Sequence, residues 1–232
     1  MSLPTAQLCQ NCHFQKDIKE ENTMAVKDGT EANDVIDLRG WSAPVSPETA
    51  HGSSGLGGND TIYGSAYYDL LQGGNGDDFL YGFNGDDGLI GQNGNDTLYG
   101  GNGDDFLSGG AGNDRLYGNA GADTLWGKDG NDHYYHGSGD GVDTINDDLS
   151  EAGNSGYGGG NDALHLTAFK LADLVYYNID NDLYLLTAAD AADNYINDGV
   201  IIEDFFLGGN NIVETLYTNN DTEMFNLTSL LA

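Results

Sequence analysis

The stretch GGNGDDFLY (73–81) is the clearest of nine consecutive nonapeptides that run from Gly55 to Tyr135, and GQNGNDTLY (91–99), GGNGDDFLS (100–108) and GGAGNDRLY (109–117) repeat it closely. Position one is Gly in all nine copies, and position four is Gly in eight, with Tyr67 as the exception. Position six is always Asp, and position eight is apolar or, once, Tyr. Fixed glycines, a fixed carboxylate and one apolar residue at a constant period predict a metal-binding solenoid.

The composition agrees with a cation-binding chain. The 232 residues contain 38 Asp+Glu against 7 Lys+Arg, giving a net charge of −31. This charge repels nucleic acid and anionic lipid, so no nucleic-acid partner is expected. No apolar run approaches the roughly 18 residues of a membrane helix, so no membrane span is expected. The first residues also lack the apolar stretch of a cleavable signal peptide.

The segment before the repeats contains Cys9, Cys12 and His13, which have the CxxCH spacing of covalent c-type haem attachment. The surrounding sequence is short and polar and offers no core that could bury a haem. The alternatives are a labile disulfide or a free CxxC in a flexible tail, and that interpretation is favoured. A Soret band on the purified protein would reverse it.

The chain divides into four parts. Residues 1–28 are expected to be a flexible N-terminal segment. Residues 29–54 hold a degenerate half-repeat, GTEANDVIDL (29–38), and a loop, which together form an N-terminal cap. The β-roll covers 55–148, although an extra residue shifts the Asp in HGSGDGVDTINDD (136–148). Six apolar runs within 149–232 predict a small β-rich C-terminal domain with a helical turn near 168–174.

The repeat supplies the ligands that calcium prefers. Glycine permits sharp turns with positive φ that bring backbone carbonyls together, and Asp adds a hard anionic oxygen. The predicted carboxylate ligands are Asp60, Asp69, Asp78, Asp87, Asp96, Asp105, Asp114, Asp123, Asp132 and Asp143. The glycines expected to shape the sites are Gly58, Gly73, Gly76, Gly82, Gly85, Gly91, Gly94, Gly100, Gly103, Gly109, Gly112, Gly118, Gly121, Gly127 and Gly130.

Two copies are expected to make one turn of the coil, so that copies n and n+2 stack at the strand spacing of about 4.8 Å. Each ion would lie between stacked turns and use the Asp of both, which gives about seven calcium ions. Burying one apolar side chain per nonapeptide stabilises the fold by less than the conformational entropy lost in ordering nine backbone residues. The roll should therefore be disordered without calcium and fold when it binds.

These copies resemble the glycine- and aspartate-rich nonapeptides of the repeats-in-toxin (RTX) haemolysin-type family, and the likeness covers about 55–145. The later runs NDALHL, DLYLL, VIIEDFF and IVETLY resemble the segment that often follows such repeats. The resemblance implies an all-β fold, a right-handed parallel β-roll. It also implies export by type I secretion machinery through an uncleaved C-terminal signal, and folding in extracellular calcium. Two copies depart from the motif: 64–72 lacks the position-four Gly, and Lys128 crowds the last loop.

Position nine carries Tyr63, Tyr81, Tyr99, Tyr117 and Tyr135 in alternate copies, so these side chains should form one row on a sheet. The row is either a cross-strand aromatic ladder or an interaction face for glycan or another subunit. At the end of the repeats, His133 and His136 are expected to stack or to lie at a solvated edge rather than to bind zinc.

The sequence contains no HExxH and no GxSxG motif, so no catalytic residue is predicted and the chain is not expected to be an enzyme. The preferred function is a secreted, calcium-binding protein with a structural, self-assembling or adhesive role at the cell surface or in extracellular matrix. Its partners would be a second copy or surface polysaccharide. The alternative is the export and folding module of a larger secreted protease, lipase or polysaccharide-modifying enzyme.

Overall fold

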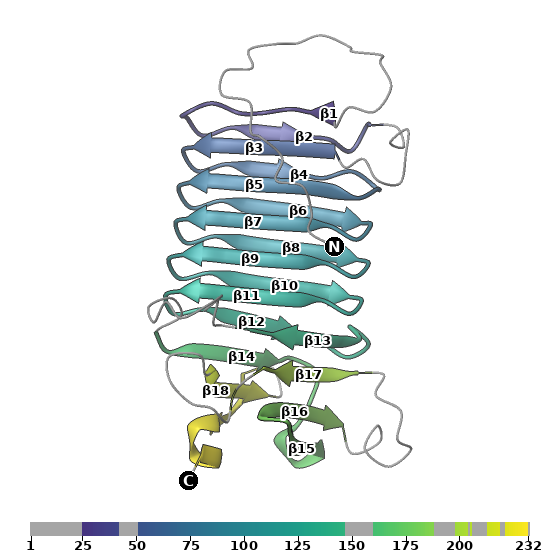
Figure 1. Ribbon diagram of the computed structural model, residues 1–232, viewed down its shortest axis with the longest axis vertical. Coiled ribbons are helices and arrows are strands. Elements are labelled where there is room, and N and C mark those ends of the chain that lie inside the picture. The colour runs from purple at the N-terminus through teal and green to yellow at the C-terminus, as the bar shows by residue number, and fades with distance from the viewer. Residues whose placement is uncertain are drawn as a thin grey trace.

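The computed structural model describes residues 25–41, 51–146, 160–187, 198–203, 205, 213–218 and 221–231. In these ranges the chain is almost entirely β-strand, wound into stacked parallel coils that form two sheets (Figure 1). The parallel β-solenoid expected from the repeat is confirmed. Cys9, Cys12 and His13 lie outside the described residues. Among those described, no helix has the length and apolar character needed to span a membrane.

The strands alternate between the two sheets along the chain. In spatial order, the ten-stranded sheet A contains β1 (Ala25–Val26), β3 (His51–Gly57), β5 (Asp69–Asn75), β7 (Gly88–Asn93), β9 (Phe106–Ala111), β11 (Thr124–Asp129), β13 (Val142–Ile145), β17 (Gly199–Ile202), β16 (Asp182–Thr187) and β15 (Leu174–Ile179). The nine-stranded sheet B contains β19 (Glu223–Asn226), β18 (Val213–Thr218), β14 (Asp162–Leu166), β12 (His133–His136), β10 (Arg115–Ala120), β8 (Thr97–Asn102), β6 (Phe79–Asn84), β4 (Thr61–Tyr63) and β2 (Val35–Asp37).

The register shows that two nonapeptides make one turn. In sheet B, Leu80 pairs with Leu98, and in sheet A, Leu89 pairs with Leu107. Each full-length repeat strand continues past the x-apolar-x triplet into the first residues of the next copy, as β6 does. Because every copy has the same length, identical positions stack on one another throughout the roll.

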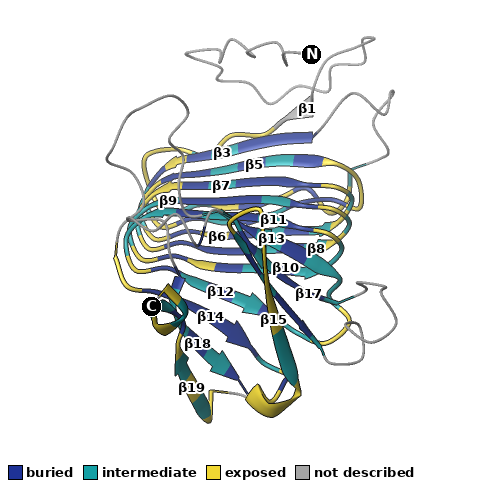
Figure 2. Cartoon of the chain, turned by 60° about the horizontal axis from the view of Figure 1, so that its bottom comes forward, coloured by how far each residue is buried: buried dark blue, intermediate teal, exposed yellow. Residues whose placement is uncertain are grey.

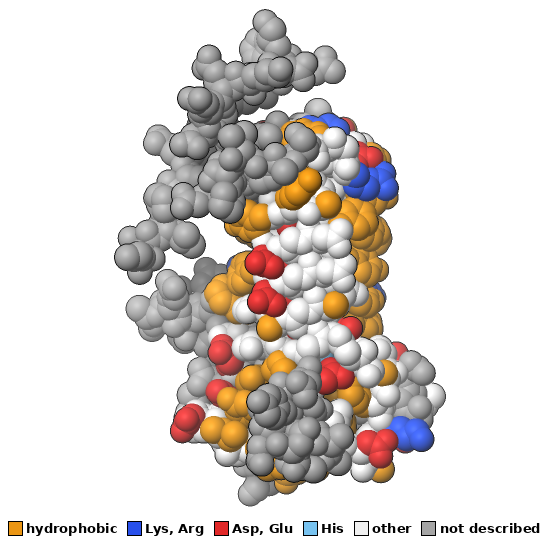
Figure 3. Space-filling model, turned by 90° about the vertical axis from the view of Figure 1, so that its right-hand side faces the viewer, with side chains coloured by type: hydrophobic (Ala, Val, Ile, Leu, Met, Phe, Trp, Pro, Cys, Tyr) orange, Lys and Arg blue, Asp and Glu red, His pale blue; other side chains and the backbone are white. Residues whose placement is uncertain are grey.

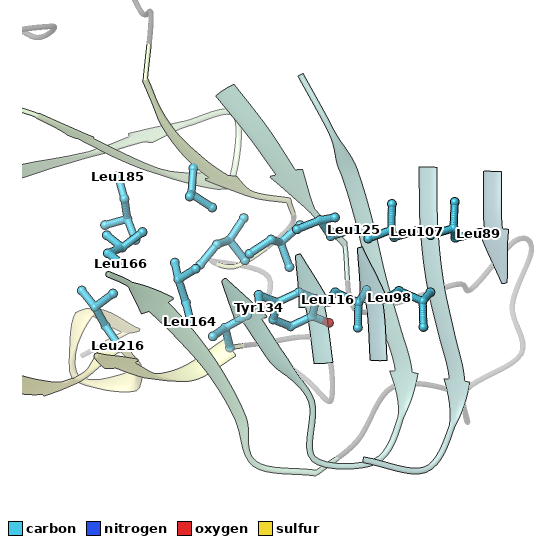
Figure 4. Close-up of a cluster of buried hydrophobic side chains, with 14 of the residues drawn as sticks. Leu89, Leu98, Leu107, Leu116, Leu125, Tyr134, Leu164, Leu166, Leu185 and Leu216 are labelled. Atoms are coloured by element: carbon cyan, nitrogen blue, oxygen red, sulfur yellow. The ribbon is translucent and has the colours of Figure 1, made fainter. Parts of the chain in front are cut away.

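The core is one side chain thick on each sheet. Position eight of every copy is buried, with relative exposure of 0–1% from Ile62 to Tyr134. Figure 4 shows two facing rows, with Leu89, Leu107 and Leu125 in one and Leu98, Leu116 and Tyr134 in the other. Exposed residues gather at the turns on the edges of the roll (Figure 2). Burying one large apolar side chain contributes only about 1.5–3 kcal/mol, so each copy has a small apolar core.

The N-terminal end is more ordered than the sequence predicted. Strand β1 pairs with β3, so the last residues of the segment expected to be flexible join sheet A. Residues 51–54, expected to lie in a loop, form the first part of β3. The degenerate copy supplies β2, which pairs with β4 through Ile36 and Ile62 at the edge of sheet B.

The C-terminal segment extends the roll. Strands β14 and β18 continue sheet B in parallel, and β17 continues sheet A in parallel. A boundary at residue 148 therefore does not separate roll from cap; antiparallel strands β15, β16 and β19 end the sheets. All six predicted apolar runs form strands, and a 3-10 helix at Leu171–Asp173 confirms the expected turn. The shift before β13 is two residues, not one, because Thr124 pairs with Thr144.

Candidate calcium-binding loops

The loops between strands are shaped by residues with left-handed backbone at positions two and four of every copy except 64–72. Position four has φ from 100° to 156° in all eight copies that carry Gly there, such as Gly76 and Gly121. Position two is also left-handed, yet non-glycine residues occupy it in Phe83, Gln92 and Lys128 with φ near 80°. Lys128 is half-buried, and burial lowers its pKa. Position two thus accepts a strained side chain.

Position one needs glycine for a different reason. Its φ is not left-handed, but a Cβ at Gly73 would collide with Oδ2 of Asp78, five residues along the chain. That Cβ would also come within 2.9 Å of the Gly91 carbonyl oxygen on the next turn. The same arrangement of position-one glycine, Asp Oδ2 and next-turn carbonyl recurs at Gly82, Gly91 and Gly100. These four loops therefore each have a small space lined by one carboxylate oxygen and one carbonyl oxygen.

The position-six aspartates form two continuous rows of backbone hydrogen bonds. Oδ1 of each Asp accepts the backbone N–H of the Asp one turn earlier, as in Asp60 to Asp78 at 2.7 Å and Asp69 to Asp87 at 2.7 Å. The row before sheet B, called the first row, contains Asp34, Asp60, Asp78, Asp96, Asp114, Asp132 and Asp162. The row before sheet A, called the second row, contains Asp69, Asp87, Asp105, Asp123 and Asp143.

The second carboxylate oxygen of most aspartates is buried without a donor. Oδ2 has no hydrogen-bond partner in Asp60, Asp78, Asp87, Asp96, Asp105, Asp114 and Asp123. A buried carboxylate oxygen without a donor is costly and calls for a cation. Carboxylate and carbonyl oxygens without sulfur or nitrogen suit calcium, so the residues present fit this ion. No group of three His, Cys, Asp or Glu side chains gathers into a metal site anywhere in the described ranges, because each loop offers one carboxylate together with backbone oxygens.

The electrostatics also favour a cation. Burial raises the pKa of Asp96, Asp105 and Asp114 to about 7 and that of Asp87 and Asp123 to about 8, with neighbouring carboxylates adding to the shift. The pKa of Asp78 rises to about 6 for the same reasons. In the metal-free fold these groups resist ionisation at neutral pH, and a divalent cation would remove that cost.

Two of the predicted ligands differ from the aspartates with a donor-free Oδ2 atom because their own Oδ2 atoms have hydrogen-bond partners. Asp69, in the copy without a position-four glycine, has its Oδ2 bonded by the Ser65 backbone N–H at 2.6 Å and by the Ser65 hydroxyl at 3.0 Å. Asp143 has its Oδ2 bonded by His136 Nδ1 at 2.7 Å. Sequence reasoning also missed Asp162, whose Oδ1 accepts the Asp132 N–H. Its position two residues before the buried Leu164 matches the repeat and was the available signal.

The five predicted tyrosines form one stacked column on the outer face of sheet B. Neighbouring ring centroids lie 4.2–5.1 Å apart, and the rings are nearly parallel. His165 and Tyr217 extend the column, and the Arg39 guanidinium lies 4.5 Å from the Tyr63 ring centroid. In Figure 3 side chains of the hydrophobic class, which includes Tyr, form a band along the right-hand edge of the roll. The ring faces contact one another, which is the geometry of a cross-strand ladder.

The two histidines at the end of the repeats have different surroundings. His133 Nδ1 lies 2.8 Å from His165 Nε2, and His165 Nδ1 lies 2.7 Å from Asp221 Oδ1. His136 is buried, and its Nε2 lies 2.9 Å from Asp198 Oδ1. His133 therefore joins the stacked aromatic face, as expected, whereas His136 lies inside the end of the roll rather than at a solvated edge.

The comparisons with known proteins agree with this geometry. The family model described as the RTX calcium-binding nonapeptide repeat (4 copies) matches residues 54–89, 81–116 and 108–143. The search of curated proteins gave no match. The matched segments contain the loops with left-handed glycines and the carboxylates with a buried, donor-free oxygen. Residues 54–143 of this chain, less than half of its length, therefore match the family of RTX calcium-binding nonapeptide repeats.

Proposed function

We propose that the chain is a secreted protein whose roll folds when it meets calcium outside the cell, holding about seven ions. The observation that carries the proposal is the set of seven buried Asp Oδ2 atoms that receive no hydrogen bond. Calcium in the adjacent spaces would supply the positive charge that these oxygens lack. Binding energy then becomes folding energy, as in other domains that fold with their metal.

Aspartate and glycine have separate roles in each loop. Oδ1 of the Asp at position six accepts a backbone N–H of the preceding turn, and its Oδ2 would bind the ion. Glycine at position one leaves room beside that oxygen, and glycine at position four lets successive loops approach closely. A Cβ at Gly94, for example, would collide with the Gly76 carbonyl oxygen. Calcium would therefore hold together turns whose apolar core is too small to do so alone.

The role that we propose outside the cell is structural, self-assembling or adhesive rather than catalytic. Strands at both ends of the roll expose apolar side chains: Val35 on β2 is 72% exposed and Tyr176 on β15 is 57% exposed. Edge strands with free backbone groups and exposed apolar side chains favour association with further copies. Export by type I secretion machinery, and surface polysaccharide as a further partner, belong to the same proposal.

Circular dichroism and negative-stain electron microscopy with and without calcium test the proposal together. The protein in excess chelator should lack the strand signal, and millimolar calcium should restore it. Magnesium at equal concentration is the matched control, because its stricter octahedral geometry suits these loops poorly. Equal strand signals in chelator and in calcium would refute calcium-driven folding. Calcium-dependent folding with only isolated particles in the micrographs would refute self-assembly alone.

A further inference from the structure

The first member of each aspartate row differs from the interior members in one respect. At interior positions the Oδ2 atom of Asp receives no donor, whereas at the first position of each row it receives two. In the first row, Asp34 Oδ2 accepts the Thr30 backbone N–H at 2.6 Å and the Thr30 hydroxyl at 2.8 Å. In the second row, Ser65 bonds Asp69 in the same way. The two rows therefore begin with the same motif, Gly-Thr/Ser-x-x-x-Asp.

Thr30 and Ser65 both occupy position two, the position that is left-handed elsewhere in the roll. Neither residue has positive φ. The backbone N–H and the hydroxyl of the same residue can therefore both turn toward the carboxylate. His51 supports this closure, because its Nδ1 lies 2.9 Å from the Ser65 hydroxyl and 3.3 Å from Asp69 Oδ1. All three side chains of this cluster are buried.

The far end of the second row is closed by a histidine. His136 falls nine residues after Gly127 and so occupies position one, which is glycine in all nine preceding copies. Its ring lies between two carboxylates, with Nδ1 2.7 Å from Asp143 Oδ2 and Nε2 2.9 Å from Asp198 Oδ1. The His136 ring therefore fills the space beside Asp143 Oδ2 and contacts that oxygen directly, as the Ser65 hydroxyl does beside Asp69.

Beside Asp132, the next-to-last member of the first row, a side chain also enters the loop. Tyr134 replaces the leucine of position eight, and its hydroxyl accepts the Gly127 backbone N–H at 2.9 Å. A Cβ at Gly127 would collide with both the Tyr134 hydroxyl and Asp132 Oδ2, so these two oxygens line the same small space. In an interior copy the corresponding space beside glycine lacks any such side chain.

We infer that Thr30 and Ser65 at the first positions of the two rows, and His136 at the far end of the second row, take the place of calcium and confine the ions to interior aspartates. These include Asp60, Asp78, Asp87, Asp96, Asp105, Asp114 and Asp123. A calcium ion bound at about 2.3–2.6 Å from Asp69 Oδ2 would need the space that the Ser65 hydroxyl fills. The inference rests on the proposed function and deepens it. It moves one expected ion from the gap between Asp69 and Asp87 to the gap beyond Asp123.

Counting ions in matched Asp→Asn variants tests the inference. Asp69→Asn and Asp87→Asn alter neighbouring positions of one row, and native mass spectrometry at saturating calcium reports the ions bound to each. Asp87→Asn should lose at least one ion relative to the natural chain, and Asp69→Asn should lose none. Loss of the same number by Asp69→Asn would overturn the inference. If the natural chain bound no calcium, the proposed function itself would fail.

A second variant tests whether the protein gains a calcium ion when the closure at Asp69 is removed. Ser65→Gly combined with Tyr67→Gly converts residues 64–72 into a copy with glycine at positions one, two and four. The hydroxyl is then gone and position two can become left-handed, so this protein should hold one more ion than the natural chain. Ser65→Thr is the control and should add none, because Thr30 closes the other row with the same groups. An unchanged count in the double variant would overturn the inference at this end.

Discussion

In excess chelator, lowering the pH should partly replace calcium. The pKa of Asp87 and Asp123 rises to about 8 and that of Asp96, Asp105 and Asp114 to about 7, from an ordinary value of 3.8. These raised values mean that the metal-free roll binds protons that the unfolded chain releases. Its stability is therefore greatest below about pH 4 and is lost as the pH rises from about 4 to about 8.

The magnitude decides whether the metal-free roll can fold. A pKa shift of one unit is worth about 1.4 kcal/mol, so each of these carboxylates costs the metal-free roll roughly 4–6 kcal/mol above pH 8. Two or three such groups match the whole stability of an ordinary domain, about 5–15 kcal/mol. Between pH 8 and pH 5, roughly 1–4 kcal/mol per carboxylate is regained because the folded state keeps its protons.

Circular dichroism in chelator at pH 8 and pH 5 measures this effect. We expect little strand signal at pH 8 and a clear increase at pH 5, with a full signal at both values in calcium. The matched variant replaces Asp87, Asp105 and Asp123 by Asn, which is neutral at every pH. It should fold more readily in chelator at pH 8 and yet bind calcium more weakly. A variant that gained no strand signal in chelator would refute the assigned cost of burying these charges.

Three further outcomes follow from the packing. Leu98→Ala should lower the stability of the calcium-loaded protein by about 3–5 kcal/mol in thermal or denaturant unfolding, because Leu98 is fully buried in a core one residue thick. Gly91→Ala should weaken calcium binding in titration calorimetry, because its Cβ would collide with Asp96 Oδ2. Gln92→Asn is the control and should not weaken it, because Gln92 already carries a side chain at φ 82° and Asn119 has φ 67° at the same position of a later copy. Tyr99→Ser should remove two ring contacts and cost about 0.4–2 kcal/mol without changing the ion count; loss of an ion would contradict a purely cross-strand role.

The sequence predicted the parts of the fold that the constant period governs. Two copies per turn, the buried position-eight residues and the stacking of Tyr63 to Tyr135 all follow from identical copies of identical length. The register after Tyr135 could not be predicted as well. Two residues are inserted before Asp143 and many more before Asp162, so the period no longer marks which residues stack. The spacing of Asp162, Leu164 and His165, which equals that of Asp132, Tyr134 and Tyr135, still keeps the pattern.

The period of the repeat also could not predict whether the Oδ2 atom of each predicted ligand accepts a hydrogen bond. Asp69 and Asp143 follow the repeat as well as Asp87 does, yet their Oδ2 atoms are bonded by Ser65 and His136. The difference comes from residues at positions one and two, where a side chain either leaves the space beside the carboxylate open or fills it. Position six identifies a carboxylate, but its neighbours decide whether that carboxylate faces an ion.

Glycine at position one and aspartate at position six are constant for the same reason. Position two varies, because a left-handed side chain such as Phe83 or Gln92 costs only about 1–2 kcal/mol of local strain. Position one does not vary within the nine copies, because any Cβ there would enter the space beside Asp Oδ2. Where glycine at position one is replaced by His136, that space holds the histidine ring, whose Nδ1 contacts Asp143 Oδ2. Glycine at one and aspartate at six act as a pair, and the pair, rather than either residue alone, makes the room in which a cation can bind.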